Sequence, residues 1–492
     1  MYFIGYDIGS SSIKASVIEK NNGKVVGVTQ YPDKEMQILS EKIGWAEQNP
    51  DTWWENVCEV TKKLLSQTRV NPKAIEGIGI SYQMHGLVLV DKNLKPLRPS
   101  IIWCDSRAIG EGDKLFRQDT QKCTLNLLNS PGNFTLSKLK WVKENEPEVF
   151  SKVYKFMLPG DYIALKITGK CTTTPSGLSE GIMWDFKNDQ PAYWLFENAG
   201  ISTELIPEIV PVFSEQGTLI KASAGELGGL KEGIPVLYRA GDQPNNALSL
   251  NVFEPGDIAA TGGTSGVVYA VSDKISSKET TRINNFAHVN HTKTHPRIGK
   301  LLCINGTGIL YSWMKTQVAN NVSYNEMNDL ASQAPVGSEG LKIYPYGNGA
   351  ERMLNNSNNG ASIRNLNFNV HKQAHMLRAS LEGIAFSFVY GMEIMREDGV
   401  VLNTIKAGGD NLFRAAIFSE TISTLLEKDI QIIDTTGATG AARAAGYSKG
   451  AFKSFSDAIY KDELIKTYKP LENKEEYLEA YNNWKQELSK LY

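Results

Sequence analysis

The chain has 492 residues and a formal net charge of −2, with 52 basic and 54 acidic side chains. Such a length suffices for two large α/β halves or about three domains, and either arrangement can bury a substantial core. Because no stretch is dense in lysine or arginine, the charge pattern gives no electrostatic support to a nucleic-acid partner.

The five cysteines and six histidines are scattered along the sequence. They form no CxxC pair and no HExxH spacing, so neither a zinc site nor a disulfide framework is indicated. The N-terminus enters directly into a strand pattern without a charged and then apolar leader, and no apolar run is long enough to span a bilayer. We therefore expect a cytoplasmic enzyme without a membrane partner.

The first predicted elements are strands around a short glycine and serine turn. Residues 2–7 and 13–18 read as strands, and Asn21-Asn22-Gly23 turns into a third strand near residues 25–29. The first two strands are joined by Gly9-Ser10-Ser11-Ser12. Turns of this kind let several backbone N–H groups and hydroxyls converge on one anion, so a phosphate-binding turn is predicted here.

A helix is predicted next, from Pro50 onward. Asn49 suits the N-cap, Pro50 suits the first helical position, and apolar residues then recur with helical spacing. The predicted buried face comprises Trp54, Val57, Cys58, Thr61, Leu64 and Leu65. This helix leads into a strand expected over residues 75–80.

A second round of the same layout begins around residue 258. Residues 257–260 and 267–271 flank the turn 262–265 as residues 4–7 and 13–18 flank the first turn. The repetition is of layout and not of sequence identity, and it favours two related units. Two such turns predict a nucleotide held across a cleft between domains 1–245 and 246–492.

Two more glycine turns lie near the C-terminus. Residues 404–411 read as a strand, a glycine turn and the start of a helix, and such a turn lets a ligand approach the backbone closely. Alone, Gly408-Gly409 is more often a plain tight turn, and the other motifs are what favour a ligand site here. For the segment 436–442, a close-packed helix start is the first interpretation, and a wall of the ligand site is the second.

Taken together, these motifs resemble the FGGY family of carbohydrate kinases over nearly the whole chain. The segments that carry the resemblance are residues 7–14, 44–50, 83–86, 97–107, 138–142, 158–162, 241–243, 262–266 and 408–409. The family is similar in fold to actin and the sugar kinases. The resemblance therefore implies an α/β fold of two ribonuclease H-like (actin/hexokinase-type) domains with a cleft between them, and ATP-dependent phosphorylation of a sugar with Mg²⁺.

Phosphoryl transfer to a sugar needs an in-line arrangement, Mg²⁺ to neutralise charge and a base for the hydroxyl proton. Asp242 is the candidate catalytic base because its carboxylate stands on a glycine-flanked turn between the two phosphate turns. The resemblance also puts the family's catalytic aspartate at this position. An ordinary Asx turn before Pro244 is the alternative interpretation.

Asp7 is the candidate Mg²⁺ residue. A carboxylate beside a phosphate turn would repel ATP unless a cation stood between them, and contact through water is expected; capping of its own turn is the alternative. Lys14 could add positive charge, although strand alternation puts it on the face opposite Ile13 and a solvated lysine is the alternative. The expected nucleotide-binding set is Gly9, Ser10, Ser11, Lys14, Gly263, Thr264, Ser265, Gly408, Gly409 and Asn411.

The sugar is expected at a polar and apolar set of side chains. His85 offers a donor and an acceptor to neighbouring hydroxyls, and Met84 or Trp103 supplies a wall for C–H faces. The full expected set is Met84, His85, Trp103, Asp105, Asp242 and Gln243. For Asp105, an ion pair with Arg107 is the alternative.

The expected partners are a small-molecule sugar and ATP. The resemblance favours a ketopentose, D-xylulose first, with ribulose, another ketose or a polyol such as glycerol as alternatives. The resemblance to the family also implies that the protein forms a homodimer. A non-catalytic sugar or nucleotide sensor and an actin-like assembling ATPase are the rivals of another class, and the presence of Asp242 with both phosphate turns argues against the sensor.

Overall fold

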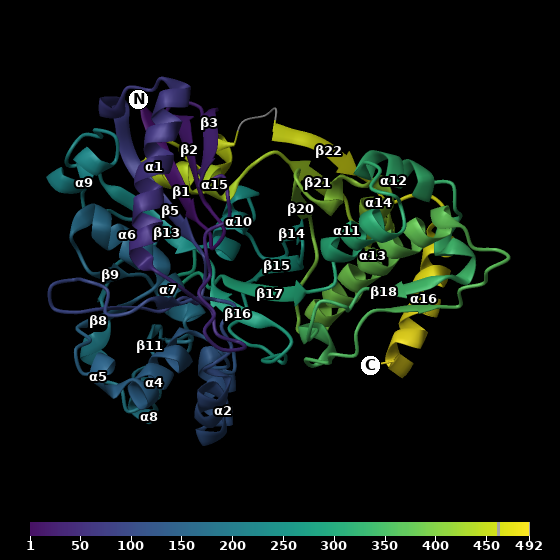
Figure 1. Ribbon diagram of the computed structural model, residues 1–492, viewed down its shortest axis with the longest axis horizontal. Coiled ribbons are helices and arrows are strands. Elements are labelled where there is room, and N and C mark those ends of the chain that lie inside the picture. Colours follow the sequence, from purple (N-terminus) through teal and green to yellow (C-terminus); the bar gives the residue numbers. More distant parts are fainter. Residues whose placement is uncertain (460–462, 492) are drawn as a thin grey trace.

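The computed structural model describes residues 1–459 and 463–491, which form two α/β lobes side by side (Figure 1). The first lobe contains a five-stranded sheet in the order β13-β5-β1-β2-β3. Its strands are β1 (Tyr2–Ile8), β2 (Ile13–Glu19), β3 (Val25–Tyr31), β5 (Ile75–Tyr82) and β13 (Val236–Gly241). The first three strands pair antiparallel, whereas β5 and β13 continue the sheet in parallel from β1.

The second lobe contains a seven-stranded sheet in the order β16-β17-β15-β14-β20-β21-β22. Its strands are β14 (Ile258–Gly262), β15 (Gly266–Ser272), β16 (Asn284–Ala287), β17 (Ile298–Ile304), β20 (Ile405–Gly408), β21 (Ile430–Ile433) and β22 (Leu464–Tyr468). Strands β17, β15 and β14 pair antiparallel, and β20 and β21 continue in parallel. This repeats the pattern of the first sheet and confirms the predicted pair of ribonuclease H-like domains.

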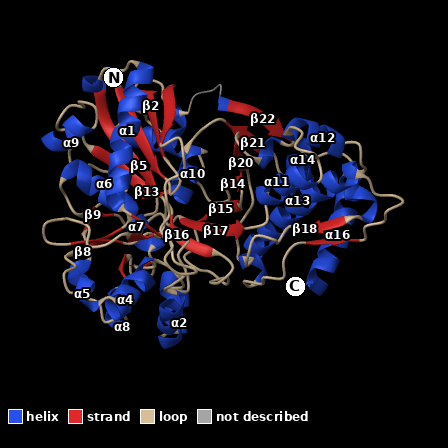
Figure 2. Ribbon diagram, in the orientation of Figure 1, coloured by secondary structure: helices blue, strands red, loops and turns tan. Residues whose placement is uncertain are grey.

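Helices cover the faces of both sheets (Figure 2). In the first lobe, α1 (Pro50–Thr68) and α6 (Pro159–Thr168) enclose a core with one sheet face. The predicted start of α1 is confirmed: Asn49 is the N-cap, and its Oδ1 accepts the Asp51 N–H at 3.0 Å. In the second lobe, α13 (Gln373–Glu397) and α14 (Ala416–Leu426) pack with the sheet in a separate core.

Helix α15 (Gly437–Ser448) follows β21 in the sequence but packs on the sheet of the first lobe, where Figure 1 shows it in yellow among the purple strands. Two glycines permit this close approach. A Cβ at Gly5 would collide with Ala438 O, and one at Gly79 would collide with Ala441 O. The second half of the chain therefore completes the first lobe.

Helix α10 (Asp242–Ser249) follows β13 and contacts α15 on its way to the second lobe. The two helices approach closely at Gly440, where a Cβ would overlap Ser249 Oγ. This crossing joins the lobes and places the N-termini of both helices between them.

The predicted helix after residue 411 begins later than expected. A 3₁₀ turn at Leu412–Arg414 comes first, because Asn411 caps it through the Phe413 N–H. Ala415 then has extended backbone angles, so α14 starts anew at Ala416.

The remaining elements are short or peripheral. The other helices are α2 (Ile109–Gln118), α3 (Thr120–Lys122), α4 (Thr135–Asn145), α5 (Pro147–Phe150), α7 (Pro175–Glu180), α8 (Tyr193–Asn198), α9 (Lys221–Glu226), α11 (Gly308–Gln317), α12 (Tyr324–Ala331) and α16 (Lys474–Leu491). The other strands are β4 (Glu47–Gln48), β6 (Val88–Val90), β7 (Ser100–Ile101), β8 (Lys155–Met157), β9 (Thr172–Thr173), β10 (Trp184–Asp185), β11 (Gln190–Pro191), β12 (Glu208–Ile209), β18 (Lys342–Tyr344) and β19 (Ser362–Arg364). None of the helices within residues 1–459 and 463–491 combines the length and the hydropathy needed to cross a bilayer.

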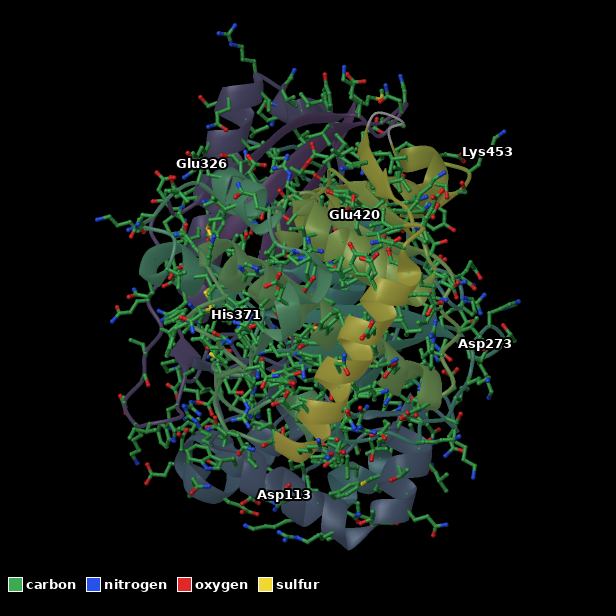
Figure 3. The ribbon with its side chains drawn as sticks, turned by 90° about the vertical axis from the view of Figure 1, so that its right-hand side faces the viewer. Asp113, Asp273, Glu326, His371, Glu420 and Lys453 are labelled. Carbon is green, nitrogen blue, oxygen red and sulfur yellow. The ribbon has the colours of Figure 1, made fainter. Side chains whose placement is uncertain are left out.

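Charged side chains are spread over the outside of the molecule. The exposed residues Asp113, Glu326 and Lys453 lie well apart (Figure 3), which agrees with the even distribution of charge along the sequence.

Candidate active site

The first phosphate turn connects β1 to β2 as predicted. It is closed by the Gly9 N–H, which donates to Ser12 O at 3.1 Å. Ser10 is half-buried and Ser11 is exposed. The hydroxyls of this turn are therefore accessible to a ligand.

Asp7 lies at the end of β1, opposite Lys14 in the β1–β2 register. Its Oδ1 accepts a hydrogen bond from Ser81 Oγ at 2.9 Å. Burial raises the pKa of Asp7, while Ser81 and the charge of Lys14 lower it. Because directly opposite residues share a sheet face, Lys14 stands on the same face as Asp7, beside the phosphate turn.

The second phosphate turn is braced by the start of α11. The Gly308 N–H donates to Gly263 O at 2.9 Å, and the Ile309 N–H donates to Thr264 O at 3.1 Å. Thr264 is exposed and Ser265 is half-buried. The turn is thus fixed through its carbonyls, and its two hydroxyls remain accessible.

The third glycine turn lies against the second. A Cβ at Gly262 would lie 3.7 Å from Asn411 Oδ1, and Gly408 and Gly409 are both half-buried. The Asn411 amide is engaged within its own turn, since its Nδ2 donates to Gly408 O at 3.2 Å. Backbone atoms of this turn are therefore more available to a ligand than the Asn411 side chain.

A chain of contacts links the two phosphate turns. At the start of α15, a Cβ on Gly437 would lie 2.6 Å from Asp7 Oδ2. Asn245 Nδ2 on α10 donates to Gly437 O at 2.9 Å, and the neighbouring Asn246 Nδ2 donates to Thr261 Oγ1 at 3.2 Å. The crossing helices therefore hold both turns around one region between the lobes.

Asp242 occupies this region. It is the first residue of α10 rather than part of an isolated turn, and Pro244 falls in the first helical turn, where its missing N–H breaks no helical hydrogen bond. Burial and the negative charge of Asp7 raise the pKa of Asp242 to about 7. A carboxyl group with this pKa can exchange a proton near neutrality, as a general base must.

The two carboxylates also suit a hydrated cation. No group of three or more His, Cys, Asp or Glu side chains within the described ranges could hold a metal by itself. Mg²⁺ in nucleotide sites takes only one or two protein carboxylates and completes its shell with water and phosphate oxygens. Asp7, which lies just before the first phosphate turn and acts electrostatically on Asp242, fits that mode.

His85 is held in an unusual conformation, with a positive φ of 62°. Its Nδ1 lies 2.9 Å from Glu180 O, and because a carbonyl only accepts, Nδ1 carries the proton and Nε2 is an acceptor. Burial, with smaller contributions from nearby positive charges, lowers the pKa of His85 to about 3. The ring is therefore neutral and presents one acceptor.

Aromatic rings from both lobes surround His85. Its ring centroid lies 4.8 Å from that of Phe134 and 5.4 Å from that of Phe286 on β16. Met84 is buried, whereas Trp103 is 54% exposed and its Nε1 lies 3.4 Å from Ser10 Oγ. Trp103 thus connects the expected sugar side to the first phosphate turn, and Gln243 is half-buried beside Asp242.

The carboxylate of Asp105 forms an ion pair with Arg107, the alternative interpretation, and its contact with the sugar stays a prediction. The residue is fully buried, and both carboxylate oxygens are engaged. Arg107 Nη2 lies 2.7 Å from Asp105 Oδ2, which also accepts the Ala46 N–H at 2.6 Å. The structural ion pair is the interpretation that the geometry supports.

The sequence interpretation missed the role of Lys138. This fully buried lysine on α4 donates from Nζ to His85 O at 2.8 Å and to Ile102 O at 2.9 Å. Burial lowers its pKa to about 7. Lys138 thus ties together the two segments that carry His85 and Trp103; it lies in a segment that carried the resemblance, but a helical lysine usually indicates a solvated position.

Comparisons with known proteins identify the family. The model of the FGGY family of carbohydrate kinases matches residues 2–249 with its N-terminal domain and 258–448 with its C-terminal domain. Xylulose kinase of Bacillus subtilis is 29% identical over 98% of this chain and 96% of the relative. Gluconokinase of the same organism is 28% identical over 96% of the chain and 92% of the relative.

A solved structure agrees with the fold. The crystal structure of xylulose kinase from Rhodospirillum rubrum superposes with a TM-score of 0.88 at 24% identity, covering 100% of this chain and 99% of the other. The repeated sheets, the crossing helices and the two family-model matches lead to one conclusion: the chain belongs to the FGGY family of carbohydrate kinases.

Proposed function

We propose that the protein transfers the γ-phosphoryl group of ATP to the 5-hydroxyl of D-xylulose, with Asp242 as the general base. The observation that carries this proposal is the position of Asp242 between two accessible phosphate turns, with its pKa raised to about 7. The similarity to xylulose kinase over nearly the whole chain supports the substrate.

In this mechanism the sugar lies between His85 and Asp242. The neutral His85 accepts a hydrogen bond from a sugar hydroxyl at Nε2, and Trp103 covers C–H surface. Ionised Asp242 takes the proton of the attacking hydroxyl while the hydroxyl-bearing turns hold the triphosphate in line. When bound through Asp7, Mg²⁺ would supply charge neutralisation at the phosphates.

Gluconate is a second candidate acceptor because gluconokinase is nearly as similar to the chain as xylulose kinase is. Gluconate differs from a pentulose in carrying a carboxylate, which a cation would have to neutralise. Lys138, the buried cation nearest to His85 O, spends its Nζ hydrogen bonds on two backbone carbonyls. Arg352, whose charge also acts on His85, is a second cation near this position, so gluconate is tested beside D-xylulose.

A coupled ADP-release assay tests the substrate. The panel comprises D-xylulose, D-ribulose, glycerol, D-gluconate and a reaction without sugar. We expect the highest kcat/KM with D-xylulose and little ADP without an acceptor. Greater turnover of gluconate or glycerol would reassign the substrate, and equal turnover without sugar would favour an assembling ATPase.

The variant Asp242→Asn tests the base. We expect a loss of about 10²- to 10⁴-fold in kcat, the usual contribution of a positioned base, with sugar and nucleotide binding retained in calorimetry. Asp113→Asn, which alters an exposed aspartate, is the matched control and should keep wild-type kcat. A D242N enzyme with near wild-type kcat would remove Asp242 from the base role.

A further inference from the structure

Helix α7 lies against the second lobe although it belongs to the first half of the chain. Thr174 caps it by accepting the Gly177 N–H at 3.0 Å. Ser176 Oγ donates to Ala287 O at 2.9 Å, and the Ala287 N–H donates to Ser179 Oγ at 2.8 Å. Both serines thus fix the helix to the end of β16, the strand that places Phe286 on the His85 ring.

Glu180, the last residue of α7, contacts His85 through its backbone. Glu180 O is 2.9 Å from His85 Nδ1, and this contact fixes the ring tautomer. Because His85 has a positive φ, its orientation depends on such external contacts rather than on local backbone preference. A shift at the end of α7 would therefore move the Nε2 acceptor.

The side chain of Glu180 lies against Gly241, the residue that precedes Asp242. A Cβ at Gly241 would overlap Glu180 Oε2 and would lie 2.6 Å from Met84 Cγ. Only glycine at this position leaves room for both side chains. Glu180 therefore packs directly against the peptide that leads into Asp242. Its carboxyl group supports the backbone at the point where α10 begins.

The surroundings of Glu180 keep it uncharged. Burial and the charges of Asp242 and Asp161 raise the pKa of Glu180 well above its usual value. Its other neighbours are the buried phenols of Tyr82 and Tyr269, whose pKa values the Glu180 charge would raise. A protonated Glu180 adds no negative charge beside Asp242, so its contribution there is its shape and polarity.

Glu180 and Tyr82 form a buried polar pair at this position. The Glu180 carboxyl group and the Tyr82 hydroxyl interact with each other through a side-chain hydrogen bond, and Glu180 Oε1 and Tyr82 Oη have no further partner among the residues that the structure describes. Buried polar groups are usually hydrogen-bonded in folded proteins, and here Tyr82 provides that partner for Glu180. The cost of keeping an acid here would be hard to explain by packing alone, since an apolar side chain could fill the same volume.

We propose that Glu180 is a positioning residue that fixes the distance between His85 and Asp242, and thereby aligns the sugar hydroxyl with the base. This inference rests on the proposed function, because it gives the two residues their roles. The backbone carbonyl holds the histidine, and the side chain supports the peptide before the aspartate. Glu180 itself, 1% exposed, is placed behind these residues and not against the sugar.

Three variants test the inference on the full-length enzyme. Glu180→Gln keeps the length and the neutral, polar character of the side chain, and should retain kcat and the pH profile within about twofold. Glu180→Asp is one methylene shorter and Glu180→Ala removes the support. Both should lose about 10- to 100-fold in kcat/KM for the sugar, because a misplacement near 1 Å costs that order of rate, while KM for ATP stays unchanged.

The control is Glu382→Gln, which alters another buried glutamate, in the second lobe, where it pairs with Arg378. It should lower thermal stability without changing KM for the sugar. Rates are referred to the folded fraction measured by circular dichroism, so that instability is not read as lost alignment. If E180A does not fold, E180D carries the test.

Either of two results overturns the inference. E180D and E180A with wild-type kcat/KM per folded enzyme would leave Glu180 a packing residue. A folded E180Q as impaired as E180A would show that an ionised carboxylate is required, contrary to positioning by a neutral group. Failure of the proposed function is separate, because it would appear in the wild-type enzyme as absence of ADP release with every sugar of the panel.

Discussion

Four carboxyl groups, of which Asp105 and Glu180 are buried and Asp7 and Asp242 half-buried, differ in the charges that surround them. Asp105 is neutralised by Arg107 and a backbone N–H. Asp7 has Ser81 and the positive charge of Lys14 beside it, whereas the charges that act on Asp242 and Glu180 are the negative charges of other carboxylates. According to its neighbours, the same chemical group thus suits a structural ion pair, a cation site, a general base or an uncharged support.

The raised pKa of Asp242 predicts a pH dependence. A base must be ionised to accept a proton, and Asp242 is protonated below pH 7, so kcat/KM for the sugar should fall about tenfold per pH unit on the acid side and level off above. The measurement is the ADP-release assay between about pH 5.5 and 8.5 at fixed ionic strength. A flat profile down to the acid end would show that Asp242 keeps an ordinary carboxyl pKa.

At the scale of elements, the crossing of α10 and α15 determines where the site residues lie. Asp242 begins one helix, and the start of the other approaches Asp7, so the angle between these helices sets the distance between the two carboxylates. The helices approach closely because Gly440 has no side chain to meet Ser249.

Gly440→Ala should therefore destabilise the protein. The added methyl group would overlap Ser249 Oγ and Cβ, and overpacking of this kind costs about 1–3 kcal/mol in the free energy of unfolding. Urea denaturation measures the change. Ser249→Gly in the same chain should recover most of the loss in a double-mutant cycle, and additive effects of the two substitutions would show that the clash is relieved elsewhere.

The sequence predicted local elements better than distant contacts. The three opening strands, the cap at Asn49 and the glycine turns after β1 and β14 depend on residues close in sequence, and each is found where it was expected. The burial of Asp105 depends on Ala46, and the role of Lys138 depends on His85 and Ile102, which are far away along the chain. No periodicity in the sequence encodes such distant contacts, so the role of Lys138 could not be assigned from it, whereas the ion pair of Asp105 with the nearby Arg107 was an alternative that the sequence offered.

At the scale of the molecule, the site is divided between two lobes, with α10 and α15 in contact at their junction. The hydroxyls of the second phosphate turn belong to one lobe, and His85 and Asp7 belong to the other. Efficient transfer to the sugar requires exclusion of water, which competes as an acceptor, so we expect the lobes to close on their ligands.

Small-angle X-ray scattering tests this closure. The radius of gyration should decrease when D-xylulose and a non-hydrolysable ATP analogue are both present, and change less with either ligand alone. Identical scattering curves in all four states would contradict closure. The D242N enzyme should close like the wild type, because it retains the groups that bind both ligands.

The placement of α15 also has a consequence for synthesis on the ribosome. The strands of the first lobe emerge within the first 241 residues, yet the helix that covers one face of their sheet is translated only at residues 437–448. Until then, that face, with Gly5 and Gly79 at the positions that α15 contacts, has no cover from its own helix. The nascent chain must shield it, and native folding of the earliest part of the protein waits for nearly the last.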